Sequence, residues 1–424
     1  MQAIGVFSDT FSPLRNRNLS TYLGGQGVSL CGTFMQATAQ SWTVWQLSHS
    51  VRDLGLVAML ESLPLLLFGA LAGTVADRVD RRRLLLGTQV AAMLLAFVFA
   101  FLVQRELIQL WHVFLLAFAL GCVSALDMPA QNAFIGDLSG IDQVRQAIAL
   151  NSMIGQVSRM VGPAAAGWIM GALGVAPAFW INGASFLAVI GTLLAVRARR
   201  APCGLGARPK DNFLEGIRYV GTQPRIQDLL LVSGLLTFFL YSLVQLLPPI
   251  ATDRLHGGPE TLGLLLGATG AGATTSLFLV MPVVLQVRRV GWMLAGAVMW
   301  AGFWVAALSA SDWMWLSISA AFLSSLAVPV VMTSTNGIIQ MLAPPNMRAR
   351  LLVLWIMVSF GLQPFAFLLV GYSGQLLGAP MAILLNGCAL ILGSAALLIM
   401  HPDLRHWQLE TELERQKGEQ LDVS

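Results

Sequence analysis

The stretch Gly73-Thr74-Val75-Ala76-Asp77-Arg78-Val79-Asp80-Arg81-Arg82-Arg83 joins two long apolar runs, residues 55–77 and 84–104. A glycine lets two helices pack closely before a tight turn, and an aspartate at a membrane edge can pair with arginines or face the positive end of another helix. Such a contact can form in one conformation and break in another. The spacing therefore predicts a gate made of Gly73, Asp77, Arg78, Arg81 and Arg82; a plain basic loop is the alternative.

The composition around this stretch is that of a membrane protein. Of the 424 residues, 56% are hydrophobic and 11% are charged, whereas about a quarter of the residues are charged in soluble domains. The mean hydropathy of +0.72 indicates that lipid rather than water faces most of the surface. The net charge of +4 comes from basic residues in short loops, a distribution that argues against a nucleic-acid partner.

Twelve apolar runs reach the length of a membrane-spanning helix, which is about 20 residues. They predict an all-α membrane protein with twelve transmembrane helices in a lipid bilayer. The runs cover residues 19–47, 55–77, 84–104, 110–132, 146–171, 176–197, 227–250, 261–287, 291–310, 313–340, 351–373 and 379–400.

The basic residues predict the orientation of these helices. With twelve spans, 21 of the 25 Lys and Arg residues fall on the side that holds both chain ends, and the positive-inside rule places that side in the cytoplasm. The opposite loops hold Arg52, Arg105 and Arg254, and Arg159 lies inside a span. The N-terminus lacks the pattern of a removable signal peptide, so we expect none.

The longest interior connection predicts the division of the chain. We expect an N-terminal six-helix bundle in 1–197, a cytoplasmic linker in 198–226, a C-terminal six-helix bundle in 227–400 and a cytoplasmic tail in 401–424. The linker contains an amphipathic stretch from Phe213 to Val220, which is typical of an interfacial helix.

The quoted stretch resembles the signature loop of the major facilitator superfamily, with Asp80 where the general pattern has glycine. Its form Ala-Asp-Arg-Val-Asp-Arg-Arg-Arg resembles one branch, the enterobactin-exporter-like proteins or transmembrane secretion effectors. Ala349 stands where that branch usually has glycine, between Arg348 and Arg350. Other segments that fit the branch are Leu14-Arg15-Asn16-Arg17-Asn18, Asp127-Met128-Pro129-Ala130-Gln131 with Phe134, Asp137-Leu138, Arg159-Met160-Val161-Gly162-Pro163, Asn182-Gly183-Ala184-Ser185-Phe186 and Pro345.

This resemblance covers nearly the whole chain and implies the major facilitator fold in a bacterial inner membrane. It also implies alternating access and proton-driven efflux of a small amphipathic molecule, with a siderophore favoured over an antibiotic or other drug. We expect small-molecule substrate, protons and lipid as the partners of a monomer. An uptake symporter or a lipid transporter on the same fold is the alternative, and a receptor that transports nothing is disfavoured.

The fifth predicted span carries Gly162, Pro163 and Gly167. A Gly-Pro pair bends a helix because it removes a backbone hydrogen bond and thins the packing surface. The pattern partly resembles the antiporter signature of the superfamily, although Ala166 stands where a second glycine would strengthen it. Tight packing without a role in antiport is the alternative.

Two spans carry polar stripes. Residues spaced by three and four positions share one helix face, and polar groups facing lipid are costly, so both stripes should face the interior. We interpret them as walls of a central aqueous cavity, and interhelical hydrogen bonding is the alternative. The stripes are Gln26, Ser29, Thr33, Gln36 and Gln40 in span one, and Ser233, Thr237, Tyr241 and Gln245 in span seven.

Three ionisable side chains lie within the predicted spans, where they are costly and hence functional candidates. Glu61 is a candidate proton carrier or an interfacial residue. Asp127 lies near a cytoplasmic helix end, where we expect it to pair with an arginine as a structural lock; proton coupling is the alternative. Arg159 lies near mid-span and either attracts an anionic substrate or ties helices together through backbone carbonyls.

The sequence offers no sign of an enzyme. The phosphate-binding Gly-x-x-x-x-Gly-Lys-Ser/Thr loop is absent from it, and its five histidines show no metal-ligand spacing. We therefore predict no cofactor and no metal. The four cysteines are scattered, and we interpret them as small core residues rather than as disulfides or metal ligands.

Overall fold

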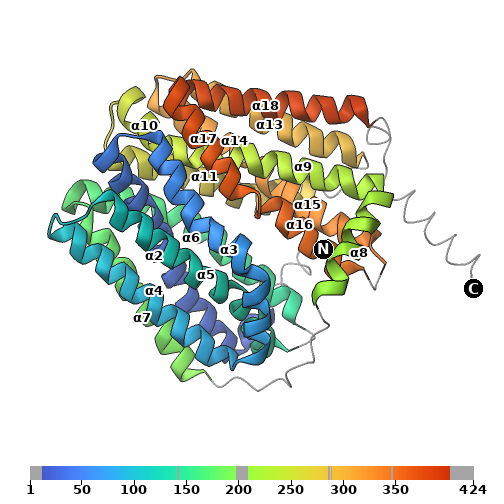
Figure 1. Cartoon of the computed structure of the whole chain (residues 1–424), viewed down its shortest axis with the longest axis horizontal. Helices are drawn as coiled ribbons and strands as arrows, with labels where there is room; N and C mark the ends of the chain where they lie inside the picture. The colour runs from blue at the N-terminus through green and yellow to red at the C-terminus, as the bar shows by residue number, and fades with distance from the viewer. Residues whose placement is uncertain are drawn as a thin grey trace, which may run out of the picture. The chain divides into compact units, whose positions relative to one another are not determined.

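The structure is a computed structural model that describes residues 12–140, 143–196, 209–284, 287, 289–344 and 347–401 (Figure 1). Its regular elements are helices, and these residues form no β-strand. The elements are η1 (Ser12–Arg15), α2 (Arg17–Ser48), α3 (Val51–Arg78), α4 (Arg81–Gln104), α5 (Leu110–Ser139), α6 (Val144–Leu173), α7 (Ala176–Ala195), α8 (Pro209–Thr222), α9 (Pro224–Leu240), η2 (Tyr241–Leu246), α10 (Leu247–Pro249), η3 (Ile250–Arg254), α11 (Pro259–Thr275), η4 (Ser276–Val280), α12 (Met281–Val284), α13 (Val290–Ser309), α14 (Met314–Ser325), α15 (Ala327–Leu342), α16 (Arg348–Ser359), α17 (Gln363–Leu377) and α18 (Ala379–Met400).

In the described part of the chain, 9 helical stretches are long and apolar enough to cross a membrane. The predicted all-helical membrane class is therefore confirmed. Helices α2, α3 and α6 are not among these stretches, although their lengths of 32, 28 and 30 residues exceed that of a span. Helix α2 carries the first polar stripe, which lowers its hydropathy. The count of twelve spans stays a prediction.

Short polar side chains begin three of the long helices. Asn16 Oδ1 accepts hydrogen bonds from the backbone N–H groups of Asn18 and Leu19 at the start of α2. Ser50 caps α3 and Asp80 caps α4 in the same way. The first backbone N–H groups of a helix have no acceptor within the helix, so these side-chain oxygens accept their hydrogen bonds.

Close contacts divide the chain into two compact units. One contains Met1–Ala207 and Leu247–Ala271, and the other contains Arg208–Leu246 and Gly272–Ser424. The predicted bundle boundaries stay a prediction. Helix α8 covers the amphipathic stretch of the predicted linker, whereas residues 198–208 of that linker and residues 402–424 of the predicted tail lie outside the described residues.

In the first unit, α2 packs against α6 and α7, α3 packs against α5, and α4 packs against α5 and α7. Two aromatic pairs add contacts, one between α2 and α5 and one between α4 and α7. The ring centroids of Tyr22 and Phe134 lie 5.1 Å apart in an edge-to-face arrangement, and those of Phe99 and Phe179 lie 4.3 Å apart in a stack. All four side chains are buried, so each pair adds specific contacts to apolar packing.

In the second unit, α13 and α18 lie side by side, and α9 packs against α15, α16 and α18 (Figure 1). Glycines bring α13 and α18 together: a Cβ added at Gly387 would lie 2.7 Å from the backbone nitrogen of Ala306 and 2.8 Å from the carbonyl oxygen of Gly302. At the end of α18, His401 Nδ1 lies 2.9 Å from Asp228 Oδ1, near the start of α9.

Within the second unit, α8 packs against the start of α16. Arg350 Nη1 lies 2.6 Å from Glu215 Oε2, and Gly216 lies against the side chain of Leu354. An ion pair at an exposed edge contributes little by itself, so the packing of the backbone at Gly216 is the firmer part of this attachment.

Candidate functional site

The basic stretch forms the turn between α3 and α4, and three of its described side chains make polar contacts within the first unit. Asp80 caps α4, where its Oδ1 accepts the backbone N–H of Arg83 at 3.0 Å. Arg81 Nη1 lies 2.6 Å from Asp137 Oδ1 near the end of α5. Arg82 donates to the carbonyl oxygens of Leu193 and Leu194 at 2.6 and 2.7 Å.

These contacts make the arginines of the stretch a clamp on two helix ends. Arg82 satisfies carbonyls at the C-terminal end of α7, where a positive charge also faces the negative end of the helix dipole. Helix α3 contains Gly73, Asp77 and Arg78, but the structure describes only the backbone at these three positions. The gate that includes them is therefore a proposal.

Glu61 lies half-buried in α3 and contacts the polar stripe of α2. Gln40 Nε2 donates to Glu61 Oε2 at 3.3 Å. Behind Glu61, α5 approaches so closely that a Cβ at Gly121 would collide with the carbonyl group of Glu61. The backbone of α3 therefore packs directly against α5, and the Glu61 carboxylate contacts the neutral amide of Gln40 on α2.

Asp127 joins α5 to α4 through two uncharged donors. Thr88 Oγ1 donates to Asp127 Oδ1 at 2.5 Å, and Gln89 Nε2 donates to the same oxygen at 2.9 Å. We expected an arginine as the partner of Asp127, but the described partners are a hydroxyl and an amide. The arginine contact in this region falls instead on Asp137, ten positions along the same helix.

Arg159 lies on α6 with its guanidinium carbon 5.2 Å from the ring centroid of Phe34 on α2. A guanidinium over an aromatic face is attracted by the ring quadrupole, more strongly where water is excluded. This contact links α6 to α2 through an aromatic ring, whereas the predicted link ran through backbone carbonyls and stays a prediction. Attraction of an anionic substrate by Arg159 stays a prediction.

The glycines beside Pro163 are points of close helix approach within a continuous α6. A Cβ at Gly162 would lie 2.7 Å from the carbonyl oxygen of Cys31 on α2. A Cβ at Gly167 would lie 2.8 Å from the carbonyl oxygen of Pro259, at the start of α11. Small residues here serve tight packing, which was the alternative to an antiport role; that role stays a prediction.

The first polar stripe contacts two neighbouring helices. Asn182 Nδ2 on α7 donates to Gln36 Oε1 at 2.7 Å, and Gln40 contacts Glu61 on α3. Gln26 and Ser29 are buried, and Thr33 donates to the carbonyl oxygen of Ser29 at 3.0 Å. Neither Asn182 nor the Gln40–Glu61 pair was predicted, because sequence periodicity identifies a shared face but not the neighbour that the face meets.

The second stripe contains a buried polar cluster. Ser233 donates to Thr335 Oγ1 at 2.9 Å, and the indole N–H of Trp355 lies 3.1 Å from that oxygen and 3.3 Å from Ser233 Oγ. Thr237 donates to the carbonyl oxygen of Ser233 at 2.9 Å. Tyr241 and Gln245 lie half-buried in η2, where α9 passes into a tighter 3₁₀ turn. The cavity role of both stripes stays a prediction.

The described residues contain no group of three or more His, Cys, Asp or Glu side chains arranged to hold a metal ion. The polar groups of the candidate site are instead single carboxylates, amides and hydroxyls on separate helices. Such groups can hydrogen-bond a solute or exchange a proton, and they lack the paired base and nucleophile that covalent catalysis needs.

Sequence comparison identifies a family that matches nearly the whole chain and relatives that match part of it. The family described as transmembrane secretion effector matches residues 8–422. The staphyloferrin A transporter of Staphylococcus aureus is 24% identical over 60% of this chain and 64% of its own length. Macrolide efflux protein A of Streptococcus pyogenes is 25% identical over 58% and 61%, and the enterobactin exporter of Shigella boydii is 24% identical over 58% and 59%. The chain thus matches less than two thirds of the length of each relative.

Solved structures share the fold at low sequence identity. A bacterial homolog of the human lysosomal transporter Spinster, in an inward-facing and occupied conformation, superposes with a TM-score of 0.68 at 15% identity, covering 92% of this chain and 97% of that one. The nucleoside transporter NupG gives a TM-score of 0.70 at 13% identity, covering 90% and 98%. Both structures are of membrane transporters.

Proposed function

Because the chain belongs to the transmembrane secretion effector family of the major facilitator superfamily, we propose that it is a proton-coupled exporter of a small amphipathic organic molecule. Membership confirms the family that the motifs predict, and the relatives are transporters rather than enzymes. In this proposal two six-helix bundles, residues 1–197 and 227–400, expose a central site alternately to the two sides of a bacterial inner membrane. Both chain ends lie in the cytoplasm of a monomeric protein.

The contact between Glu61 and Gln40 is the observation that best supports proton coupling. A carboxylate whose described partner is a neutral amide can gain and lose a proton without breaking an ion pair. The protonated form can still hydrogen-bond the amide oxygen of Gln40, because a carboxylic acid donates where a carboxylate only accepts. Glu61 is therefore our candidate proton carrier, and Asp127, fixed by two donors, is our candidate structural residue.

The relatives support a choice of substrate class. They are named for staphyloferrin A, enterobactin and macrolides. We propose a siderophore as the substrate, with an antibiotic second. The polar stripes, set in otherwise apolar helices, supply the hydroxyl and amide groups that such a solute needs.

Transport in inside-out vesicles tests direction and coupling together. An acid interior should drive accumulation of the exported siderophore or macrolide, because the protons then leave as the substrate enters. We expect Asp77→Asn to abolish this accumulation while the protein still inserts, and Glu61→Gln to abolish its dependence on the proton gradient. Glu106→Gln, a change of an exposed carboxylate between α4 and α5, is the control and should transport normally.

The outcomes separate the alternatives. Accumulation only in right-side-out vesicles would indicate an uptake symporter. Normal flux by Asp77→Asn would remove the gate, and normal proton dependence in Glu61→Gln would remove the proton carrier. Deletion of the gene should lower siderophore secretion in iron-starved medium or raise drug sensitivity; no change in either would contradict the proposed substrate classes.

A further inference from the structure

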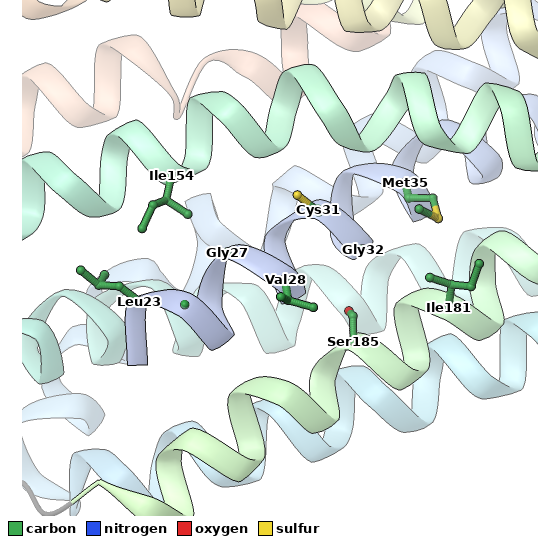
Figure 2. A pocket seen from close by; sticks show the side chains of 10 residues that line it. Leu23, Gly27, Val28, Cys31, Gly32, Met35, Ile154, Ile181 and Ser185 are labelled. Carbon is green, nitrogen blue, oxygen red and sulfur yellow. The ribbon is translucent and has the colours of Figure 1, made fainter. Parts of the chain in front are cut away.

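An apolar groove of about 520 Å³ lies on the first unit, away from the polar stripe (Figure 2). Its floor is a row of residues on α2 from Leu23 to Met35, which includes three glycines. Figure 2 shows this row with Ile154 of α6 on one side and with Ile181 and Ser185 of α7 on the other. The glycines leave space above the backbone of α2, and the larger side chains of Ile154 and Ile181 border this space.

The lining chemistry selects an apolar occupant. Ser185 carries the only side-chain oxygen or nitrogen among the lining residues, and its hydroxyl already donates to the carbonyl oxygen of Asn182 at 2.8 Å. Cys31 adds a thiol, which is a weak hydrogen-bonding group. A polar solute would leave its own groups unpaired here, at a cost that apolar contact does not offset.

The shape selects a thin, extended occupant. Val28 and Ile181 stand 54% and 42% exposed, so the groove is open in its middle, whereas Leu23 and Met35 at its two ends are buried. From Leu23 to Met35 it follows α2 for roughly 18 Å at about 1.5 Å per residue. That length is close to one leaflet of a hydrocarbon core of about 30 Å. A second helix, about 10 Å across, is too wide for a furrow floored by single glycines.

Positive charge gathers at one end of the groove. Helices α2 and α6 run parallel, as the contacts of Gly27 with Ile154 and of Gly162 with Cys31 show, so their first turns lie at the same end. Arg17 begins α2, Arg145 lies in the first turn of α6, and Arg15 lies on η1, which packs against both helices. All three arginines are exposed. An anionic group at this end would be favoured by their combined charge.

We propose that the groove binds one acyl chain of an anionic phospholipid whose phosphate lies at the end marked by Arg15, Arg17 and Arg145. The lipid then covers the apolar face of α2 opposite the polar stripe and fills the space between α6 and α7. This lipid is a resident ligand of the fold and is separate from the exported substrate, so the proposal does not depend on the transport direction or on proton coupling.

Photo-crosslinking in bilayers tests the site. Full-length protein is placed in phosphatidylglycerol that carries a diazirine on one acyl chain, illuminated, digested and mapped by mass spectrometry. We expect crosslinks concentrated on Val28, Cys31, Ile154 and Ile181. Gly24→Leu should fill the groove, because a Cβ there meets no atom within 4 Å, and should lower crosslinking at these residues about tenfold.

A matched variant controls for the added side chain. Gly87 of α4 is also exposed and also has no neighbour within 4 Å of an added Cβ, so Gly87→Leu should leave the crosslinks unchanged. Phosphatidylcholine with the same diazirine chain should label the groove several-fold less. Equal labelling of the Gly24→Leu groove, or labelling spread evenly over the faces of α4 and α2, would overturn the proposal.

A second measurement does not depend on the folding of a variant. In detergent, added phosphatidylglycerol should slow alkylation of Cys31 by N-ethylmaleimide several-fold and should leave Cys388, a half-buried thiol on α18, unchanged. Equal slowing of both thiols would contradict a specific site. Protection by a free fatty acid as strong as that by the phospholipid, with no effect of headgroup charge, would contradict the assigned headgroup.

Discussion

Asp80 shows how a single residue adapts the basic stretch to its turn. The general pattern of the superfamily has glycine at this position, and glycine has no side-chain acceptor. The Asp80 carboxylate caps α4 and also places negative charge at the positive end of that helix. The cap fixes the start of α4, and from there Arg81 and Arg82 reach α5 and α7.

The Arg81–Asp137 pair should contribute to stability because both side chains are largely shielded, with 25% and 12% of their surface exposed. We expect Asp137→Asn to lower the free energy of unfolding by about 1–3 kcal/mol, less than a fully buried pair. The midpoint of thermal unfolding in detergent measures the effect. Asp137→Glu should restore most of the lost stability, and the control variant Glu106→Gln should leave the unfolding midpoint unchanged. An unchanged midpoint in Asp137→Asn would show that the pair is not stabilising.

For single residues, the sequence identifies which side chains are unusual but not which partners they contact. Glu61, Asp127 and Arg159 stand out because charge is costly in an apolar helix. Their contacts with Gln40, Thr88 and Phe34 depend on the rotation and register of neighbouring helices, which a single sequence does not fix.

Pairs of helices in this chain meet through glycine, and the α13–α18 pair allows a direct test. We expect Gly387→Ala to destabilise the protein by about 1–3 kcal/mol, because the new methyl group would overlap α13 and force the helices apart. Gly296→Ala on the exposed face of α13, where an added Cβ meets nothing within 4 Å, is the control and should be neutral or slightly stabilising. Unfolding midpoints of the two variants give the comparison, and equal midpoints would contradict the role of close approach.

Helix positions follow from the apolar runs, since lipid exposure imposes both length and composition. The predicted run 379–400 coincides with α18, and the run 84–104 lies within α4. Two changes of helix geometry were not predicted: the seventh run, 227–250, becomes a 3₁₀ helix at Tyr241–Leu246, and its last residue begins a π-helix over Ile250–Arg254. Pro248 and Pro249 were the available signal, because proline removes hydrogen-bond donors from a helix.

For the whole molecule, the uneven distribution of basic residues predicts a topology that fusions can test. Alkaline phosphatase should be inactive and green fluorescent protein bright when fused to either chain end or within 198–208. The reverse should hold for fusions at residues 105–109, between α4 and α5. The physical reason is the cost of moving arginines across the membrane. Opposite signals from the two chain ends would contradict an even number of spans.

The contact between His401 and Asp228 has a consequence for chain architecture. It places the last residue after α18 beside the first turns of α9, so the segment from α9 to α18 enters and leaves at one point. A domain whose ends adjoin can be inserted into a host polypeptide without stretching either flank. The segment between these adjoining ends departs from that description at Leu247–Ala271, which belong to the first unit, so the second unit is not one continuous insert.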